Sequence, residues 1–375
     1  MSRARFAVLS LFFAAGSFYG TWTSRIPEVQ LRLGLSESEL GGVLLALAVG
    51  TIAALLVSGW LVERQGSRAV IAVSLTVAAG GLLLLSITPS ALLLFVVLLG
   101  FGAAMSALDV AMNAQAVWVE QRAGTARMSS FHAAFSLGAL AGSGSGAGLI
   151  ALGLPIFGHF AIVGMAMLVL CTVQLGALLA DRAGADSKAP ESQGHAMETG
   201  TAQPDATVAP GGSNAEVGPA IQIPPRVTWG LGFIAMVSTI GEAVMGDWTG
   251  IYLRDVVAAQ PGVYALGFAA FSAMMTIGRF VGDSLGKRVQ SERLVGAAGG
   301  LAAAGIVLAV LVPSVLTSLI GFAAVGAGLS IVIPIAFSAA GRLPDISAGR
   351  ALASVATIGY AGFLIAPPLV GTMAD

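Results

Sequence analysis

Long apolar stretches follow one another along the whole chain, separated by charged residues, proline or glycine. A helix needs roughly 20 mostly apolar residues to cross about 30 Å of hydrocarbon, so each stretch of that length predicts a membrane-spanning helix. Eleven stretches qualify, with approximate ranges 6–24, 40–62, 69–88, 91–117, 129–151, 156–180, 227–250, 262–284, 293–312, 315–340 and 350–373. Residues 91–102 are apolar on every face, whereas strands of a membrane β-barrel alternate apolar and polar residues. The pattern predicts an all-α membrane protein.

A polar segment rich in Pro, Gly, Ala and Ser interrupts the pattern at residues 181–226. Such a composition buries too little apolar surface to offset the entropy of ordering, which is typical of a disordered linker. We therefore expect an N-terminal bundle of six helices over 1–180 and a C-terminal bundle of five helices over 227–375.

The two bundles share short sequence matches in the same order. Residues 20–23 (GTWT) match 246–249 (GDWT), and the dipeptide at 89–90 (PS) matches that at 313–314. The separations between matching positions differ by only a few residues, which indicates a parallel tandem repeat.

The basic residues are distributed unequally between the two sides of the predicted membrane. With a cytoplasmic N-terminus, 15 of the 18 Lys and Arg residues lie on the cytoplasmic side, and only Arg25, Arg32 and Arg254 lie outside. Because basic residues concentrate in cytoplasmic loops, this distribution predicts that the N-terminus is cytoplasmic.

Composition excludes several classes of function. Only 10% of the residues are charged and the net charge is −1, so there is no basic surface of the kind that binds nucleic acid. The single cysteine, Cys171, cannot form an intrachain disulfide, and no Cys/His spacing suggests a metal site. The glycine-rich run 138–148 lacks a lysine and lies inside an apolar stretch, which favours close helix packing over phosphate binding. We find no enzyme motif and expect neither a cofactor nor an enzymatic activity.

Several segments carry a family resemblance. Residues 59–68 (GWLVERQGSR) resemble the cytoplasmic loop signature of the major facilitator superfamily, with Glu63 where aspartate is usual, and 279–288 is a weaker copy. Residues 23–30, 109–116 and 128–133 are similar to a bacterial subgroup that includes the MosC membrane protein of rhizopine metabolism and, more distantly, the fucose permeases.

This resemblance implies a major facilitator fold of two six-helix parallel repeats that works by alternating access. It also implies a monomer in the inner membrane of a bacterium, surrounded by the lipid bilayer, with protons and a small-molecule solute as its partners. The family has twelve spans, and this chain stops at Asp375 after the eleventh. We therefore expect a fragment rather than a protein that lacks an outer helix.

Three ionisable residues are candidates for proton coupling, because a charge inside a bilayer is costly unless it has a function or a partner. Asp109 lies about eight residues from the cytoplasmic end of its stretch, roughly 12 Å at helical rise. A low dielectric favours the neutral carboxyl group, so Asp109 could bind and release a proton, or only bond to neighbouring helices. Glu242 is a second candidate, for protonation or solute binding, unless it only partners a neighbouring polar group. His132 is a candidate relay, unless it lies in water at the interface.

Five residues are candidates for solute binding. Asn113 lies one turn from Asp109 on the same face, and Gln115 lies further around that helix. Tyr19, Trp22 and Trp248 could stack on a sugar ring, although aromatic residues near helix ends are often interfacial anchors.

Three charge pairs are candidates for gating. Arg25 and Asp247 flank the outer ends of two stretches that the resemblance places face to face, although an exposed pair would contribute little energy. The resemblance also implies that two latches hold the cytoplasmic side closed, and these are Glu63 with Arg68 and Asp283 with Arg288.

The resulting hypothesis is a secondary active transporter that moves a small polar solute, such as a sugar, cyclitol or amino-sugar, by proton-coupled symport. The sugar idea comes from the resemblance. The alternatives are a proton-driven efflux antiporter for amphipathic or cationic compounds, and a membrane solute sensor that does not transport.

Overall fold

A computed structural model describes residues 2–124, 128–180, 226–286, 288–343 and 348–375, although a few side chains within these ranges, among them that of Asp283, are not described. The first half contains α1 (Ser2–Leu33), α2 (Glu37–Gln65), α3 (Ser67–Ile87), α4 (Ala91–Ala123), α5 (Met128–Ala151), α6 (Ile156–Gln174) and the short η1 (Leu175–Ala177). The second half contains α7 (Arg226–Asp255), α8 (Leu266–Gly286), α9 (Ser291–Leu311), α10 (Val315–Leu329), α11 (Val332–Ala340) and α12 (Ala348–Ala374). Almost all of the expected linker lies outside the described residues.

The described residues confirm the all-α prediction. Ten helical segments among them are long and apolar enough to cross a membrane, and α8 adds a shorter apolar helix at Leu266–Gly282. The segment Val315–Ala340 is among the ten, but the structure divides it into α10 and α11. Pro334 explains this break, because a proline ring clashes with the carbonyl four residues earlier, which belongs to Ser330.

Local capping signals set several helix boundaries. Ser36 and Glu39 form a capping box at the start of α2, and the side chains of Ser90 and Ser314 accept backbone N–H groups at the starts of α4 and α10. Gly124 ends α4 in the left-handed region, with a φ of 62° that suits glycine. The corresponding caps of α4 and α10 agree with the repeat seen in the sequence.

Glycines allow α1 and α5 to pack backbone against backbone. A Cβ atom on Gly16 would overlap the carbonyl oxygen of Phe135, and one on Gly138 would overlap the carbonyl oxygen of Phe13. The predicted role of the glycine-rich run in close packing is therefore confirmed.

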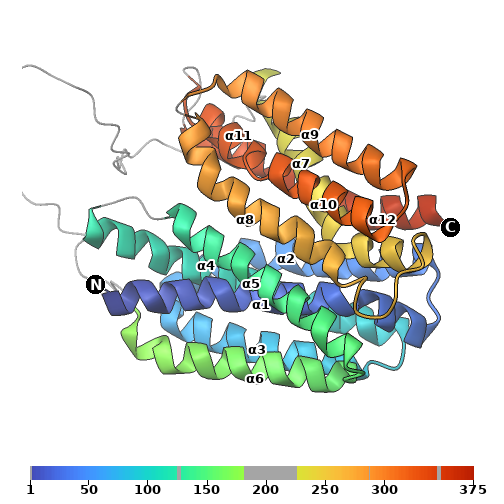
Figure 1. Ribbon diagram of the computed structural model, residues 1–375. Coiled ribbons are helices and arrows are strands. Elements are labelled where there is room, and N and C mark those ends of the chain that lie inside the picture. The colour runs from blue at the N-terminus through green and yellow to red at the C-terminus, as the bar shows by residue number, and fades with distance from the viewer. Residues whose placement is uncertain (1, 125–127, 181–225, 287, 344–347) are drawn as a thin grey trace, which may run out of the picture.

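The two halves lie side by side, and the N-terminus and Asp375 lie at opposite ends of the bundle (Figure 1). We refer to the end with the N-terminus as the near end and to the end with Asp375 as the far end. Contacts between the halves run mainly through α2 with α12, α5 with α8 and α1 with α7, and α1 also contacts α8.

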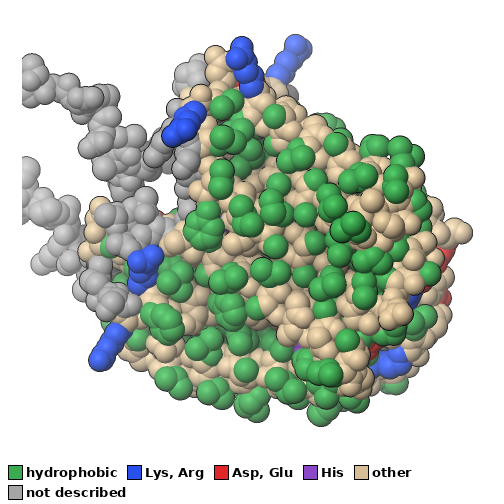
Figure 2. Space-filling model, in the orientation of Figure 1, with side chains coloured by type: hydrophobic (Ala, Val, Ile, Leu, Met, Phe, Trp, Pro, Cys, Tyr) green, Lys and Arg blue, Asp and Glu red, His purple; other side chains and the backbone are tan. Residues whose placement is uncertain are grey.

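Apolar side chains cover the flank of the molecule, and Lys and Arg side chains appear toward its ends (Figure 2). Leu56, Leu92 and Val173 illustrate this surface, with exposed fractions of 83%, 75% and 75%. So much exposed apolar surface is suited to lipid rather than to water.

Candidate functional site

A cavity of about 340 Å³ lies between the two halves. Helices α1, α2, α4 and α5 line it from the first half, and α7, α8 and α12 line it from the second. Its charged lining residues are Asp109, Glu242, Asp247 and Arg279. The cavity therefore combines three carboxyl groups with a single guanidinium group.

Asp109 has a partner on its own helix. The side-chain amide of Asn113 donates to Asp109 Oδ1 at 3.1 Å and to the Asp109 backbone oxygen at 2.8 Å. The predicted placement of these two residues on one face of α4 is confirmed. Asn113 does not line the cavity itself, so its direct effect is to orient the carboxyl group of Asp109.

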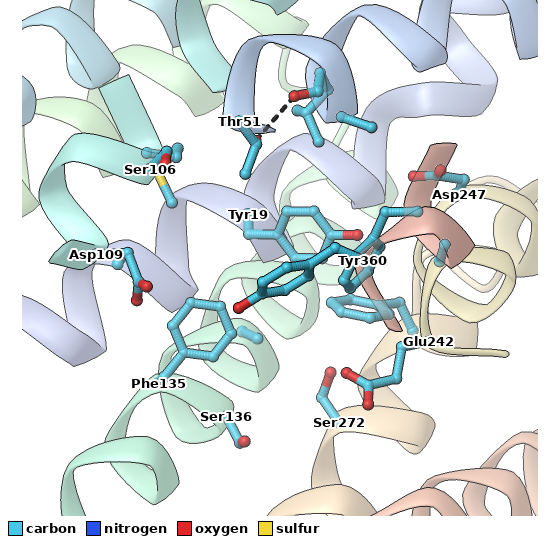
Figure 3. Close-up of a pocket in the computed structure, with 18 of the residues that line it drawn as sticks. Tyr19, Thr51, Ser106, Asp109, Phe135, Ser136, Glu242, Asp247, Ser272 and Tyr360 are labelled. Atoms are coloured by element: carbon cyan, nitrogen blue, oxygen red, sulfur yellow. Dashed lines mark hydrogen bonds between the residues drawn. The ribbon is translucent and has the colours of Figure 1, made fainter. Parts of the chain in front are cut away.

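Two tyrosines lie between the carboxyl groups. Figure 3 shows the rings of Tyr19 and Tyr360 in the middle of the cavity, with Asp109 on one side and Glu242 and Asp247 on the other. The ring of Tyr19 meets that of Phe268 edge to face, with centroids 5.6 Å apart. No hydrogen bond or ion pair from a described residue reaches the carboxyl group of Glu242 or Asp247. Both carboxyl groups therefore line the cavity without a hydrogen-bond partner among the described residues.

Arg279 lines the cavity and is a candidate functional residue that sequence reasoning missed. Its Nη1 donates to Ser136 Oγ on α5 at 2.6 Å, and it is close enough to interact electrostatically with Glu242. The sequence pattern placed Arg279 with the cytoplasmic residues and with a loop signature. A signal was nevertheless present, because position 279 falls inside the expected span 262–284, where a charge suggests a function.

His132 lies one helical turn before Ser136, whose hydroxyl group donates to the His132 backbone oxygen at 3.3 Å. Its ring packs edge to face on Phe12, with centroids 5.3 Å apart, and it interacts electrostatically with Arg279. His132 is not among the residues that line the cavity.

Three of the residues expected to bind solute lie away from the cavity. Gln115 is fully buried, and its side-chain amide donates to Ser67 Oγ at 2.8 Å and to the Leu179 carbonyl oxygen at 2.9 Å. Gln115 is two positions after Asn113, and side chains two positions apart point in directions about 200° apart around a helix. Gln115 therefore faces the opposite side of α4. Trp22 and Trp248 are buried in one apolar cluster beyond the cavity, where the two halves meet.

The structure does not bring Arg25 and Asp247 together. Asp247 lines the cavity, whereas Arg25 is 1% exposed and has its partners within the first half. Its guanidinium group donates to both Glu28 carboxylate oxygens at 2.9 and 2.7 Å, to the Leu154 carbonyl oxygen at 2.9 Å and to His159 Nδ1 at 3.1 Å. A polar cluster thus replaces the expected gate pair.

The expected latches are not formed among the described side chains. Glu63 is exposed and makes no ion pair with Arg68, which donates to the Leu178 carbonyl oxygen instead. Arg288 is exposed, and the side chain of its expected partner Asp283 lies outside the description.

Hydrogen bonds join the two halves at the far end. Tyr264 Oη donates to Glu28 Oε1 at 2.9 Å, and Arg254 donates to the Pro27 carbonyl oxygen at 2.7 Å and to Gln30 Oε1 at 2.8 Å. The Asp375 carboxylate accepts the backbone N–H groups of residues 37 and 38 at 3.0 and 3.2 Å. These bonds close the far end.

Beside the cavity, one hydrogen bond between described residues crosses between the halves, the bond from Arg279 to Ser136. Toward the near end the two halves diverge (Figure 1). The hydrogen bonds between the halves are therefore concentrated at the far end.

Comparisons with known proteins agree with this architecture. The sequence model of the Major Facilitator Superfamily matches residues 7–367. An uncharacterized MFS-type transporter of Yersinia pestis is 33% identical over 365 residues, which cover 97% of this chain and 87% of that protein. The membrane protein MosC of Rhizobium meliloti is 28% identical over 369 residues, which cover 98% of this chain and 83% of that protein.

Solved structures match the fold. A mutant of the nucleoside transporter NupG aligns with a TM-score of 0.70 at 12% identity, covering 98% of this chain and 90% of that one. A bacterial homolog of the human lysosomal transporter Spinster, in an inward-facing and occupied conformation, aligns with a TM-score of 0.67 at 14% identity. The alignment covers 98% of this chain and 80% of that one. The match of the family model over nearly the whole chain and the two-half fold together show that this chain is a multi-pass membrane transporter of the major facilitator superfamily, not an enzyme.

Proposed function

We propose that this transporter carries a small polar organic solute across a bacterial inner membrane by alternating access, in symport with protons. The observation that carries the proposal is the position of three carboxyl groups, contributed by both halves, around one cavity. Asp109 belongs to the first half and Glu242 and Asp247 to the second, so one solute in the cavity can contact carboxyl groups of both halves.

The setting of Asp109 and Glu242 supports the proposed proton coupling. A carboxylate is stable in a cavity open to water but costly in one closed off from water, because removal of its hydration favours the neutral form. Neutral carboxyl groups therefore let the cavity close and reopen on the other side. Arg279 is the only Lys or Arg among the lining residues that the structure describes, so it cannot neutralise all three carboxylates.

The other lining residues suit a solute that carries several hydroxyl groups. Tyr19, Tyr360, Ser106 and Ser272 bring hydroxyl groups to the cavity wall, and carboxylates accept hydrogen bonds from hydroxyl or ammonium groups. A volume of about 340 Å³ falls within the range of small-molecule sites. An amino-sugar or amino-cyclitol would use both the hydroxyl and the carboxyl groups.

We assign the near end to the cytoplasm, because basic residues concentrate there, as in cytoplasmic loops. Arg3, Arg64 and Arg122 are exposed at that end. With this orientation the closed far end faces outward, and the conformation is inward-facing.

A second candidate function is proton-driven efflux of an amphipathic cation. It is favoured by the aromatic part of the cavity wall, which contains Phe101, Phe135, Phe268, Phe271 and Phe363. Aromatic faces attract organic cations, and the excess of carboxyl groups would add to this attraction.

Proton flux in proteoliposomes tests the proposal. Addition of one polar solute should make the outside medium more alkaline, and Asp109→Asn should remove that signal while Glu292→Gln, a change at an exposed carboxylate, should keep it. No flux with any sugar, cyclitol or amino-sugar, together with proton-driven movement of amphipathic cations, would replace symport by the efflux candidate.

A further inference from the structure

His159 and Arg25 make a direct contact in a buried site near the far end. Arg25 Nε donates to His159 Nδ1 at 3.1 Å, and the two residues are 1% and 0% exposed. His159 belongs to α6 and Arg25 to α1, and no sequence motif points to a role for His159.

The contact defines the protonation state of the ring. A guanidinium group is always charged and has only donors, so His159 Nδ1 has to offer a lone pair. The proton of the neutral ring is then on Nε2, which lies 3.4 Å from Ser145 Oγ. His159 is therefore a neutral histidine beside a permanent cation.

The surroundings contain little charge that could stabilise a second cation. On α1, Arg25 and Glu28 face the site, and Glu28 already binds Arg25 and Tyr264. The other elements that pack on α6 are α3, α5 and η1. The charged or titratable side chains there are Arg68 of α3 and His132 of α5, which lie toward the near end of their helices.

The same cluster holds the two halves together. Arg25 fixes the Glu28 carboxylate through two hydrogen bonds, and Glu28 Oε1 accepts the hydroxyl group of Tyr264 from the second half. Arg25 also binds the Leu154 carbonyl oxygen in the segment between α5 and α6. The position of Arg25 therefore affects the contact of Glu28 with Tyr264.

We propose that His159 is a positioning residue for the closed far end, and that its protonation releases Arg25 and Glu28 and so opens the cavity on that side. A protonated ring has no lone pair for Arg25 and places a second cation against it in a site shielded from water. Arg25 then moves away, Glu28 loses its fixed position, and the bond to Tyr264 weakens. A proton that arrives from the far side would thus favour the outward-facing state before it reaches Asp109. This inference rests on the proposed alternating access.

The test measures the far end directly and needs no transport. Leu92 and Leu316 are exposed residues at the starts of α4 and α10, one in each half, and are 75% and 68% exposed. Spin labels are attached at Leu92→Cys and Leu316→Cys in a Cys171→Ser background. Double electron–electron resonance then measures the distance between the two labels, which reports the separation of the halves. As pH falls from about 8 to about 4, the long-distance population should grow severalfold, because opening exposes the ring to water, where histidine is readily protonated below about pH 6.5.

His159→Asn is the decisive variant, because its side-chain oxygen can accept the Arg25 hydrogen bond but does not titrate. It should show the short wild-type distance at high pH, which also demonstrates folding, and should keep that distance at low pH. An unchanged wild-type distance, or a His159→Asn response equal to that of wild type, would overturn the inference.

A second background separates this inference from the proposed function. Asp109→Asn should keep the pH response of the far end although it abolishes proton-coupled uptake. Loss of the response in Asp109→Asn, with its retention in His159→Asn, would assign the response to the cavity and overturn the inference. A normal distance response without solute-driven proton flux would contradict the proposed symport alone.

Discussion

Arg279 Nη1 and Ser136 Oγ lie 2.6 Å apart and join α8 of the second half to α5 of the first. This hydrogen bond lies beside the cavity, whereas the other cross-half hydrogen bonds among the described residues lie at the far end. It therefore limits how far the halves separate around the solute site in the observed conformation.

Ser136→Ala should destabilise the observed conformation relative to conformations that lack this bond. A hydrogen bond to a charged group contributes about 1.5–3 kcal/mol, and cavity water can replace part of it, so we expect roughly a tenfold shift in population. Spin labels at the exposed near-end positions Arg122 and Arg288 would measure this shift. Thr276→Val is the matched control, because its hydroxyl group binds only the Ser272 backbone oxygen of its own helix. Equal distance distributions in the two variants would contradict the prediction.

Asp109→Asn should abolish uphill accumulation of the solute but retain exchange of solute between the two sides. The amide keeps the shape and hydrogen-bonding capacity of the side chain but cannot carry a proton through the cycle. Concentrative uptake and counterflow, measured in the same vesicles, distinguish the two activities. Retained accumulation would remove Asp109 from the coupling mechanism.

Tyr264→Phe should weaken the far-end closure at every pH. The change removes the hydroxyl group that donates to the Glu28 carboxylate but keeps the ring, and a hydrogen bond to a charged group contributes about 1.5–3 kcal/mol, so we expect at least roughly a tenfold change in population. Labels at Leu92 and Leu316 would report a larger open fraction at high pH and a smaller further increase at low pH, because the bond that His159 protonation weakens is already absent. A closed fraction equal to that of wild type would show that this bond contributes nothing to closure.

Gly138→Ala should destabilise the protein, because its Cβ atom would overlap the Phe13 carbonyl oxygen of α1 and force the two helices apart. We expect a loss of about 1–3 kcal/mol, typical of overpacked interiors. Gly144→Ala is the control in the same run, because its Cβ atom would meet open space. Thermal unfolding in detergent measures both variants, and equal melting temperatures would argue against close packing of α1 on α5.

The sequence predicted the helices well and the site in part. Asp109 and Glu242 were identifiable because a charge in an apolar stretch is conspicuous. The spacing of four residues between Asp109 and Asn113 predicted that both lie on one face of the helix. Gln115 and the two tryptophans were misplaced, because the sequence does not show which side of a helix faces a cavity. Arg279 was assigned to a loop although it lay within an expected span.

Contacts between residues far apart in the chain could not be predicted from the sequence. His159 and Arg25 are 134 positions apart, and Tyr264 and Glu28 are 236 apart. A single sequence does not specify the rotation and tilt of the helices that bring such residues together. Those orientations depend on how the helices pack, and only the structure supplies them.

The backbone contact between α1 and α5 also has a practical use. Because carbonyl groups meet glycines directly there, α1 and α5 have no compressible side-chain layer between them and should move as one rigid body. A probe pair placed within the first half would therefore keep a constant separation throughout the cycle. The distance between these two probes is a constant reference, with which distances measured between the two halves can be compared.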